Sequence, residues 1–194
     1  MNLAEQLRLT ESDQFCIYLR KSRADAEAEK LGEGETLARH ERILKDFATR
    51  EGLPIGKIYK EIVSGETIAD RCEIQEMIKE SYEGMWKGIL VVEVTRLSRG
   101  NQGDAQTIMD CLRYGNHNKG MLVVTPTKIY DIVHSPDEEE YMEFELFMSR
   151  REYKMICNRM KRGKLQAVIE GNFMSSIRPY GFKIKIRKNF NSKP

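Results

Sequence analysis

The chain has 194 residues, 40% of them hydrophobic, which is enough for one globular domain with a core of its own. Its 32 basic and 30 acidic residues leave a formal net charge of +2, so charge alone neither indicates nor excludes a nucleic-acid partner. No apolar run approaches the roughly 20 residues that span a bilayer and the N-terminus lacks a signal-peptide pattern, so we expect a soluble, cytoplasmic protein. The four cysteines lie far apart and there are only three histidines, which indicates neither a disulfide framework nor a metal site.

Strand and helix patterns alternate along the first two thirds of the sequence. The predicted strands cover residues 15–20, 55–63, 88–94 and 120–126. The predicted helices cover residues 36–52, with Thr36 as the N-cap, 74–84 and 102–114, and the polar residues 21–35 read as a long loop. The run 88–94 is apolar almost throughout, as strands buried on both faces of a parallel sheet are. The alternation predicts an α/β fold with a mostly parallel central sheet flanked by helices.

The pattern changes at Pro136 to one uninterrupted helical segment that ends before Gly171. At 1.5 Å per residue such a helix is roughly 50 Å long. Its acidic start over 137–140 suits the positive end of the helix dipole, and its second half is strongly basic. Residues 178–194 are basic and aromatic and stop without forming a unit. We therefore divide the chain into a domain over 1–135, a long helix over 136–170 and a truncated segment over 171–194.

Basic side chains follow the predicted strands at what should be one edge of the sheet. Arg20 ends the first strand, Arg96 and Arg99 follow the third, and Arg71 precedes the second helix. Because the carboxyl ends of parallel strands meet in space, we expect these arginines to converge on a bound anion. Ser22, which stands among them, is a candidate nucleophile, and its cationic surroundings suit a phosphate better than a carbonyl group. The alternative is a solvated basic surface in which each arginine makes an ordinary ion pair.

Signatures of other enzyme classes are missing from the sequence. None of the patterns GxxxxGK[ST], HExxH, GxGxxG or GxSxG occurs. His40 on the first predicted helix, and His117 and His134 in predicted loops, are interpreted as surface residues, and none stands where it could act as a base for Ser22. The sequence therefore predicts neither a metal nor a cofactor.

Five short motifs occur in one order along the chain. They are Y-x-R-x-S at 18–22, S-G-x-x-x-x-x-R at 64–71, R-L-x-R at 96–99, E-x-x-x-x-x-x-R at 152–159 and R-P-Y-G-F at 178–182. With these motifs the chain resembles the serine recombinase family, the resolvase and invertase class. It is most similar to the N-terminal catalytic domain of the large serine recombinases of phages and mobile elements, cut off where the DNA-binding region begins.

The resemblance implies a site and a reaction. Ser22 would attack DNA to give a 5′-phosphoserine link and a free 3′-hydroxyl group, and reversal of the attack would rejoin exchanged strands without a metal ion or ATP. The residues that would bind and activate the scissile phosphate are Arg20, Arg71, Arg96 and Arg99. The residues in supporting roles would be Glu93, Glu152 and Arg159. The general acid and base stay open, and our hypothesis is that Arg99 protonates the leaving 3′-oxygen.

Three positions depart from the family pattern. Thr95 stands where the family usually has the Asp of D-R-L-x-R, and Glu93 is the carboxylate that could replace it. His40 and Tyr153 stand where small resolvases carry Gln and Arg. The long 21–35 loop favours the large subgroup.

The resemblance also implies partners. These are double-stranded DNA attachment sites and further copies of the chain, as a homodimer and as a tetramer in the synaptic complex, in a bacterial cytoplasm at the nucleoid. We expect a dimer interface in the first half of the long helix, around Phe144, Leu146, Phe147 and Met148. We expect DNA contacts at Arg162, Lys164 and Arg178, where cations can meet phosphates. The alternatives are a non-catalytic DNA-binding or assembly module with the same fold and an unrelated phosphate-ester hydrolase, and the choice between a phage integrase and a transposon recombinase stays open.

Overall fold

The computed structural model describes residues 3–10, 12–22, 37–63, 68, 71–98, 102–173 and 180–181. The chain forms two compact units, residues 1–153 and 154–194. The first unit contains a five-stranded sheet in the order β2-β1-β3-β4-β5. Its strands are β1 (Phe15–Ser22), β2 (Ile55–Val63), β3 (Gly88–Leu90), β4 (Leu122–Val124) and β5 (Ile129–Tyr130). Strands β1 to β4 are parallel and β5 is antiparallel to β4, which confirms the predicted α/β fold with a mostly parallel sheet.

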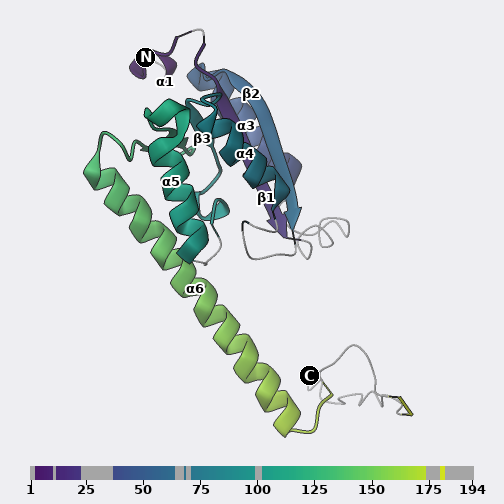
Figure 1. Ribbon diagram of the computed structural model, residues 1–194. Helices are drawn as coiled ribbons and strands as arrows, with labels where there is room; N and C mark the ends of the chain where they lie inside the picture. The colour runs from purple at the N-terminus through teal and green to yellow at the C-terminus, as the bar shows by residue number, and fades with distance from the viewer. Residues whose placement is uncertain are drawn as a thin grey trace, which may run out of the picture. The chain divides into compact units, whose positions relative to one another are not determined.

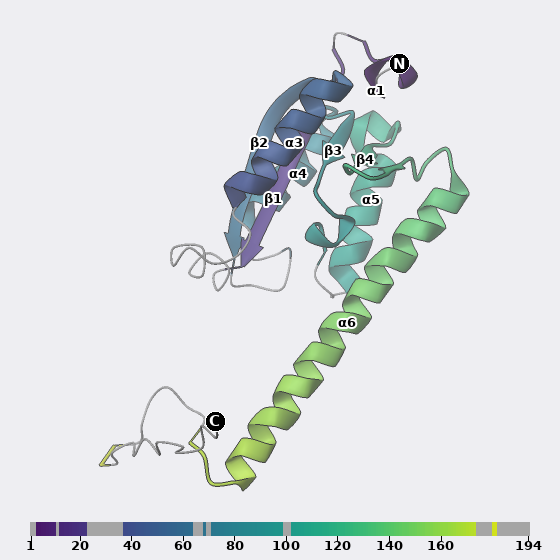
Figure 2. The same ribbon diagram turned by 180° about the vertical axis from the view of Figure 1, so that it is seen from behind.

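Helices cover both faces of this sheet (Figures 1 and 2). One face carries α1 (Leu3–Gln6) and α3 (Leu37–Glu51), and the other carries α4 (Cys72–Tyr82), α5 (Gln102–Asn118) and the start of α6 (Pro136–Ile169). Side chains of β1 alternate between the two layers, as a strand period of two requires. Ile17 and Leu19 join the core beneath α3, whereas Cys16 and Tyr18 join the core beneath α4 and α5.

The local signals for element ends are confirmed at several points. The predicted stop at Gly52 has φ 71°, the stop near Gly84 has φ 79°, and Gly171 after α6 has φ 80°. These are left-handed conformations that glycine adopts without a steric penalty. Within α5 the regular helix gives way after Tyr114, as predicted, because Asn116 and the residue after it have positive φ. Thr36, the predicted N-cap, and most of the predicted loop over 21–35 lie outside the described residues.

The two central apolar runs form shorter strands than the sequence indicates. Only Gly88–Leu90 and Leu122–Val124 pair as strands, and the first run then bends into a 3-10 turn, η2 (Val94–Arg96). Val91 still donates its backbone N–H to the Val124 carbonyl at 3.0 Å, so the chain leaves the sheet gradually. The run is apolar because it is buried, and burial does not distinguish a strand from the turn that follows it. At β1 the opposite occurs, since Lys21 and Ser22, expected in a loop, extend the strand.

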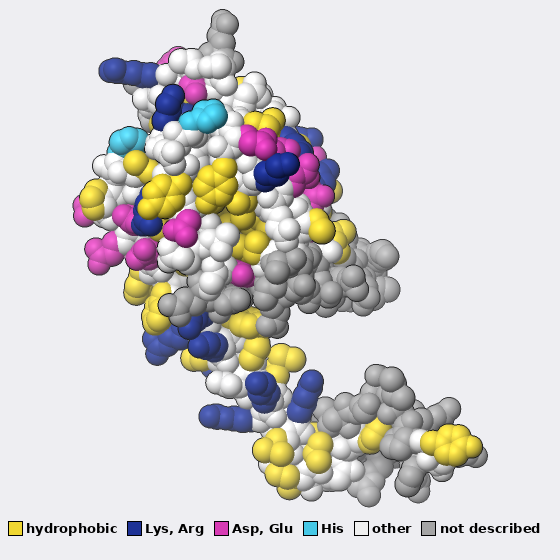
Figure 3. All heavy atoms as spheres, in the orientation of Figure 1, with side chains coloured by type: hydrophobic (Ala, Val, Ile, Leu, Met, Phe, Trp, Pro, Cys, Tyr) yellow, Lys and Arg dark blue, Asp and Glu magenta, His cyan; other side chains and the backbone are white. Residues whose placement is uncertain are grey.

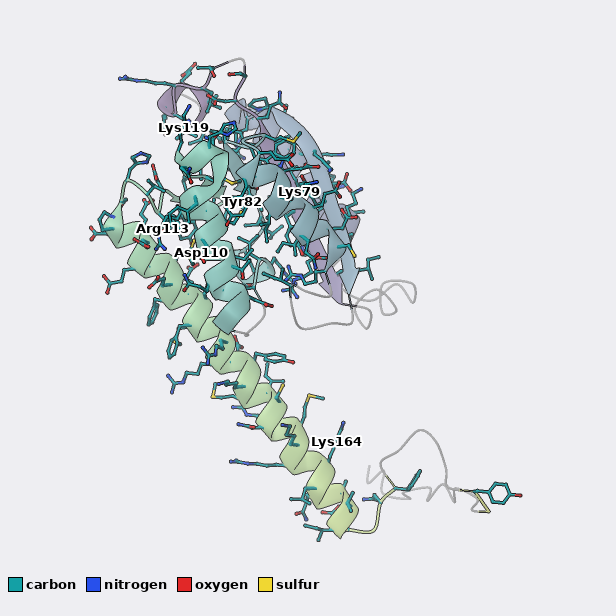
Figure 4. The ribbon with its side chains drawn as sticks, viewed as in Figure 1. Lys79, Tyr82, Asp110, Arg113, Lys119 and Lys164 are labelled. Carbon is teal, nitrogen blue, oxygen red and sulfur yellow. The ribbon has the colours of Figure 1, made fainter. Side chains whose placement is uncertain are left out.

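The long helix predicted from Pro136 is confirmed as α6, with 34 residues. In the first unit its opening turns pack on the sheet, and the Glu145 carboxylate accepts a hydrogen bond of 2.9 Å from the Tyr130 hydroxyl. Arg113, on the side of α5 that faces α6 in Figure 4, pairs with Glu139. Within the described part of the chain, neither α6 nor any other helix combines the length and apolarity needed to cross a membrane.

Two sequence expectations about exposure are wrong. His40, expected at the surface, is buried on α3, because it shares the inward face of that helix with Leu44 and Phe47, four and seven residues further on. Leu146, expected in a dimer interface, is only 6% exposed and belongs to the core of its own domain together with Met142. His117 and His134 are exposed, as expected.

Candidate active site at the strand ends

Four buried polar side chains lie where β1 and β2 end, and three of them, Tyr18, Glu61 and Arg71, are bonded to one another. Tyr18 and Arg20 come from β1, Glu61 comes from β2, and Arg71 stands just before α4; we call them the strand-end cluster. The parallel register pairs Arg20 with Glu61, so neighbouring strands deliver the cation and the carboxylate to the same level. All four residues are buried.

Arg71 is the most enclosed member, with 1% of its surface exposed. Its Nε donates to Glu61 Oε2 at 3.1 Å and its Nη2 donates to the Tyr18 hydroxyl at 2.6 Å. Both Nη1 and Nη2 donate to the Leu97 carbonyl oxygen at 3.1 Å. Each of the three guanidinium nitrogens therefore has a protein acceptor, as a buried cation requires.

Glu61 and Tyr18 complete the surroundings of Arg71. Tyr18 donates its hydroxyl proton to Glu61 while its oxygen accepts the bond from Arg71. Burial raises the pKa of Tyr18 well above its usual value, so the phenol stays protonated and able to donate. The second Glu61 oxygen accepts a bond of 3.3 Å from the backbone N–H of Glu73, in the first turn of α4.

Arg20, on β1, also donates hydrogen bonds to backbone carbonyl groups of the chain that follows β3. Its Nε donates to the Arg96 carbonyl oxygen at 2.8 Å, and its Nη2 donates to the Thr95 carbonyl oxygen at 3.1 Å. Together with the Leu97 carbonyl held by Arg71, three consecutive carbonyl groups of the chain at η2 receive guanidinium donors. We call residues 94–98 the η2 segment. Arg20 and Arg71 thus fasten the η2 segment to the sheet.

The side chain of Arg96, in the middle of the η2 segment, is partly exposed. Its Nε is buried and has no hydrogen-bond partner among the described residues, and the nearest carboxylate oxygen, of Glu93, is 3.9 Å away. Glu93 is exposed and accepts a bond of 3.1 Å from the Thr95 hydroxyl. Glu93 therefore stands beside the arginine, as the sequence comparison with D-R-L-x-R anticipates, but at the limit of an ion pair.

The remaining predicted site residues fall in three groups. Ser22 is the last residue of β1 and its backbone pairs with that of Val63, while its side chain lies outside the description, as do Arg99 and Arg178. Glu152 is exposed on α6, and within the described residues it makes no ion pair with the arginines of the strand ends. In the second unit the described basic candidates of α6 are exposed; they are Arg159, Arg162 and Lys164. Figure 3 shows the Lys and Arg side chains along this half of the helix, and Lys164 is labelled in Figure 4.

Sequence reasoning found the arginines and missed their acceptors. Glu61 was not singled out, although its alternation with Tyr59 along β2 puts it on a face that packs against apolar helices. A carboxylate on such a face requires a cationic partner, and that was the available signal. The Leu97 carbonyl could not be found this way, because it depends on where the chain turns after β3.

An α/β domain with arginines gathered at the carboxyl ends of its strands, followed by a long helix, belongs to a class suited to handling phosphate groups. The family model described as "Resolvase, N terminal domain" matches residues 15–173. This match spans more than half of the chain, so the chain belongs to the resolvase family of serine recombinases, which carries out site-specific recombination. The resemblance seen in the motifs is confirmed.

Solved structures of the same kind are similar to this chain at low identity. The N-terminal catalytic domain of TP901-1 integrase is 15% identical, with a TM-score of 0.48, and the match covers 74% of this chain and 98% of that one. The C-terminal catalytic domain of ISC1926 TnpA, an IS607-like serine recombinase, is 16% identical, with a TM-score of 0.47, and the match covers 79% and 99%. A resolvase family site-specific recombinase from Streptococcus pneumoniae is 12% identical, with a TM-score of 0.47 and coverage of 82% and 97%.

Proposed function

We propose that this chain is the catalytic domain of a site-specific DNA recombinase in which Ser22 is the nucleophile. The observation that carries the proposal is the convergence of arginines from separate segments beside the end of β1. Arg20, two residues before Ser22, contacts the backbone of Arg96, and the Nε of Arg96 has no hydrogen-bond partner among the residues that the structure describes. A phosphodiester provides the anionic oxygens that such donors bind.

The proposed reaction conserves the number of phosphoester bonds. The Ser22 hydroxyl oxygen attacks the scissile phosphorus, a bond from this oxygen to phosphorus forms, and the bond from phosphorus to the 3′-oxygen breaks. The serine proton passes to a base and the leaving 3′-oxygen gains a proton, for which Arg99 is our candidate donor. Cations positioned around the phosphate stabilise the charge of the transition state. Because the phosphoserine retains the ester bond, the reverse attack by a 3′-hydroxyl of another strand needs no nucleotide cofactor.

A non-catalytic assembly or DNA-binding module with this fold is the second candidate. The observation in its favour is that every guanidinium nitrogen of Arg71 is bonded to Glu61, Tyr18 or a carbonyl group, which is how a purely structural arginine behaves. The two candidates differ in one product, a covalent protein–DNA adduct.

Changing Ser22 to Ala should abolish this adduct without abolishing DNA binding. The test incubates the full-length protein with labelled duplexes that span the ends of the genetic element carrying its gene, followed by a denaturing gel. We expect the wild-type protein to become linked to a 5′ end, and Ser22→Ala to give no adduct because it lacks the attacking oxygen. Ser12→Ala, which alters an exposed serine, is the matched control and should retain the adduct. If wild-type protein shifts the DNA on a native gel but never becomes linked to it, the assembly-module reading replaces the catalytic one.

An apolar face of α6 supports self-association, as the family as a whole oligomerises. Phe144, Phe147 and Met148 are 58%, 57% and 41% exposed, and their i, i+3, i+4 spacing places them on one side of the helix. Met142 and Leu146, on another side, are buried in the domain. We propose that this exposed face forms a homodimer and that two dimers form the synaptic tetramer.

Charge at two positions of that face should convert the dimer into a monomer. Phe144→Glu combined with Phe147→Glu would bury two carboxylates in an apolar interface, so we expect sedimentation velocity to report only monomers and the circular dichroism spectrum to be unchanged. Tyr114→Glu, at a similarly exposed aromatic on α5, is the control and should stay dimeric. A double variant that sediments like the wild-type dimer would remove this face as the interface.

The basic second half of α6 is the proposed DNA-contacting segment. Arg162 and Lys164 are exposed there, and Arg178 follows in the sequence. Phosphate contacts of this kind release counterions, so the DNA affinity should fall steeply as salt concentration rises.

A further inference from the structure

Arg71 and Arg20 donate to backbone carbonyl groups with guanidinium groups that the family resemblance assigns to the scissile phosphate. We propose that Tyr18 and Glu61 are positioning residues: acting through Arg71, they hold the η2 segment in the conformation that presents Arg96 to the scissile phosphate. The inference rests on the proposed function and deepens it. It gives Arg20 and Arg71 the role of holding the η2 segment, and it gives Arg96 the role of binding the scissile phosphate.

The first step is the orientation of the Arg71 guanidinium plane. Glu61 accepts from Nε on one edge of this plane, and the Tyr18 oxygen accepts from Nη2. Tyr18 and Glu61 are also bonded to each other, so the three groups form a closed triangle. With these two acceptors in place, Nη1 and Nη2 each donate to one further atom, the Leu97 carbonyl oxygen.

The second step is the dependence of the η2 segment on those donors. Within the described part of the chain, the turn has two backbone bonds of its own, from the Arg96 N–H to the Glu93 carbonyl and from the Leu97 N–H to the Val94 carbonyl, each of 3.0 Å. The side chains of Val94 and Leu97 are buried and set the depth of the segment, but apolar contacts do not direct carbonyl groups. The carbonyls of residues 95–97 are directed by Arg20 and Arg71.

The third step is the consequence for Arg96. The Arg96 carbonyl accepts a bond from Arg20, and the Leu97 carbonyl accepts a bond from Arg71. The two peptide groups that follow Arg96 along the chain are therefore fixed. A loosened Leu97 carbonyl would let the backbone rotate and move the Arg96 guanidinium group. Misplacement of a catalytic cation by about 1 Å is enough to reduce a rate substantially.

The test compares two buried tyrosines that are register partners in the sheet. Tyr18→Phe removes the hydroxyl group that joins Glu61 to Arg71, and Tyr59→Phe removes a hydroxyl group that donates to Glu80 and accepts from Trp86. Each variant loses the hydrogen bonds of one buried phenol, but only the first phenol contacts Arg71. Amide hydrogen exchange of the full-length protein, measured by NMR without DNA, reports the mobility of the η2 segment directly.

We expect Tyr18→Phe to raise exchange rates at residues 94–98 by roughly five-fold relative to those in α3, a factor typical of one lost hydrogen bond. In the adduct assay the same variant should cleave more slowly with an unchanged DNA dissociation constant. Tyr59→Phe should alter neither ratio. Unchanged exchange at 94–98 in Tyr18→Phe, or an equal rise in Tyr59→Phe, would overturn the inference.

Glu61→Gln is the second variant, since it keeps the side-chain size and removes the charge that orients Arg71. It should raise exchange at 94–98 by more than Tyr18→Phe does; if it does not fold, the two tyrosine variants still decide. The exchange measurement involves no DNA, so the outcomes separate. A wild-type protein that forms no adduct overturns the proposed function and with it the role of Arg96, whereas unchanged exchange overturns the positioning role even when the adduct forms.

Discussion

Replacing Arg71 by Met should lower the free energy of unfolding by about 3–5 kcal/mol, the range found when one partner of a buried ion pair is removed. The substitution leaves the Glu61 carboxylate, only 4% exposed, with its charge uncompensated. It also leaves the Leu97 carbonyl oxygen without the two donors it accepts from Arg71. Urea unfolding at neutral pH, followed by circular dichroism, measures the difference.

The control for this prediction is an exposed pair on the same domain. Arg50 contacts Glu51 at 3.0 Å but is well solvated, so Arg50→Met should change stability by at most about 1 kcal/mol. Adding Glu61→Leu to Arg71→Met should restore part of the loss, because the double variant buries no lone charge. A loss below about 1 kcal/mol for Arg71→Met alone, against the range expected for a buried pair, would mean that the strand-end cluster is open to water in solution.

Replacing Gly88 by Ala should destabilise the sheet at its centre. A Cβ atom at this position would lie 2.6 Å from Phe15 Cε1 and 2.8 Å from the backbone oxygen of Leu122. Gly88 pairs with both of these residues, on β1 and on β4, so neither neighbour can move without disturbing the ladder. We expect a loss near the upper end of the 1–3 kcal/mol typical of overpacking, about 3 kcal/mol. For a chain of this size that loss corresponds to a melting temperature lower by roughly 6–12 °C.

Gly163 provides the matched control, because a Cβ atom there would meet nothing within 4 Å. It lies inside α6, where alanine favours a helix by up to about 1 kcal/mol over glycine. Gly163→Ala should therefore leave the melting temperature unchanged or raise it slightly. Equal effects of the two substitutions, measured by calorimetry, would show that the close approach at Gly88 relaxes easily.

The elements that could be predicted are those whose signals are local. β2 was predicted with its observed bounds, Ile55–Val63, and the start of α6 was predicted at Pro136. In both cases a periodic pattern runs between residues that end regular structure, and no distant contact is needed to interpret it. α1 and β5 were missed, since elements of 4 and 2 residues carry too few positions for a period.

For the candidate site, the sequence alone determined the residue types and the edge of the sheet at which they gather. A parallel α/β pattern brings strand ends together, so Arg20, Arg71 and Arg96 could be assigned to one region before any coordinates were known. The family followed from the spacing of the same residues. These inferences depend on order along the chain, which a sequence contains in full.

The tertiary structure alone decided what each arginine contacts. Arg71 is bonded to Glu61 across strands and to a carbonyl group of the η2 segment, and Arg20 is bonded to the same segment. These partners depend on where the chain leaves the sheet after β3 and on which side chains become buried beneath α4. A buried N–H donor without an acceptor costs free energy, so each buried arginine pairs with the acceptors that the fold places beside it. The sequence pattern does not show which acceptors these are, because they come from distant parts of the chain.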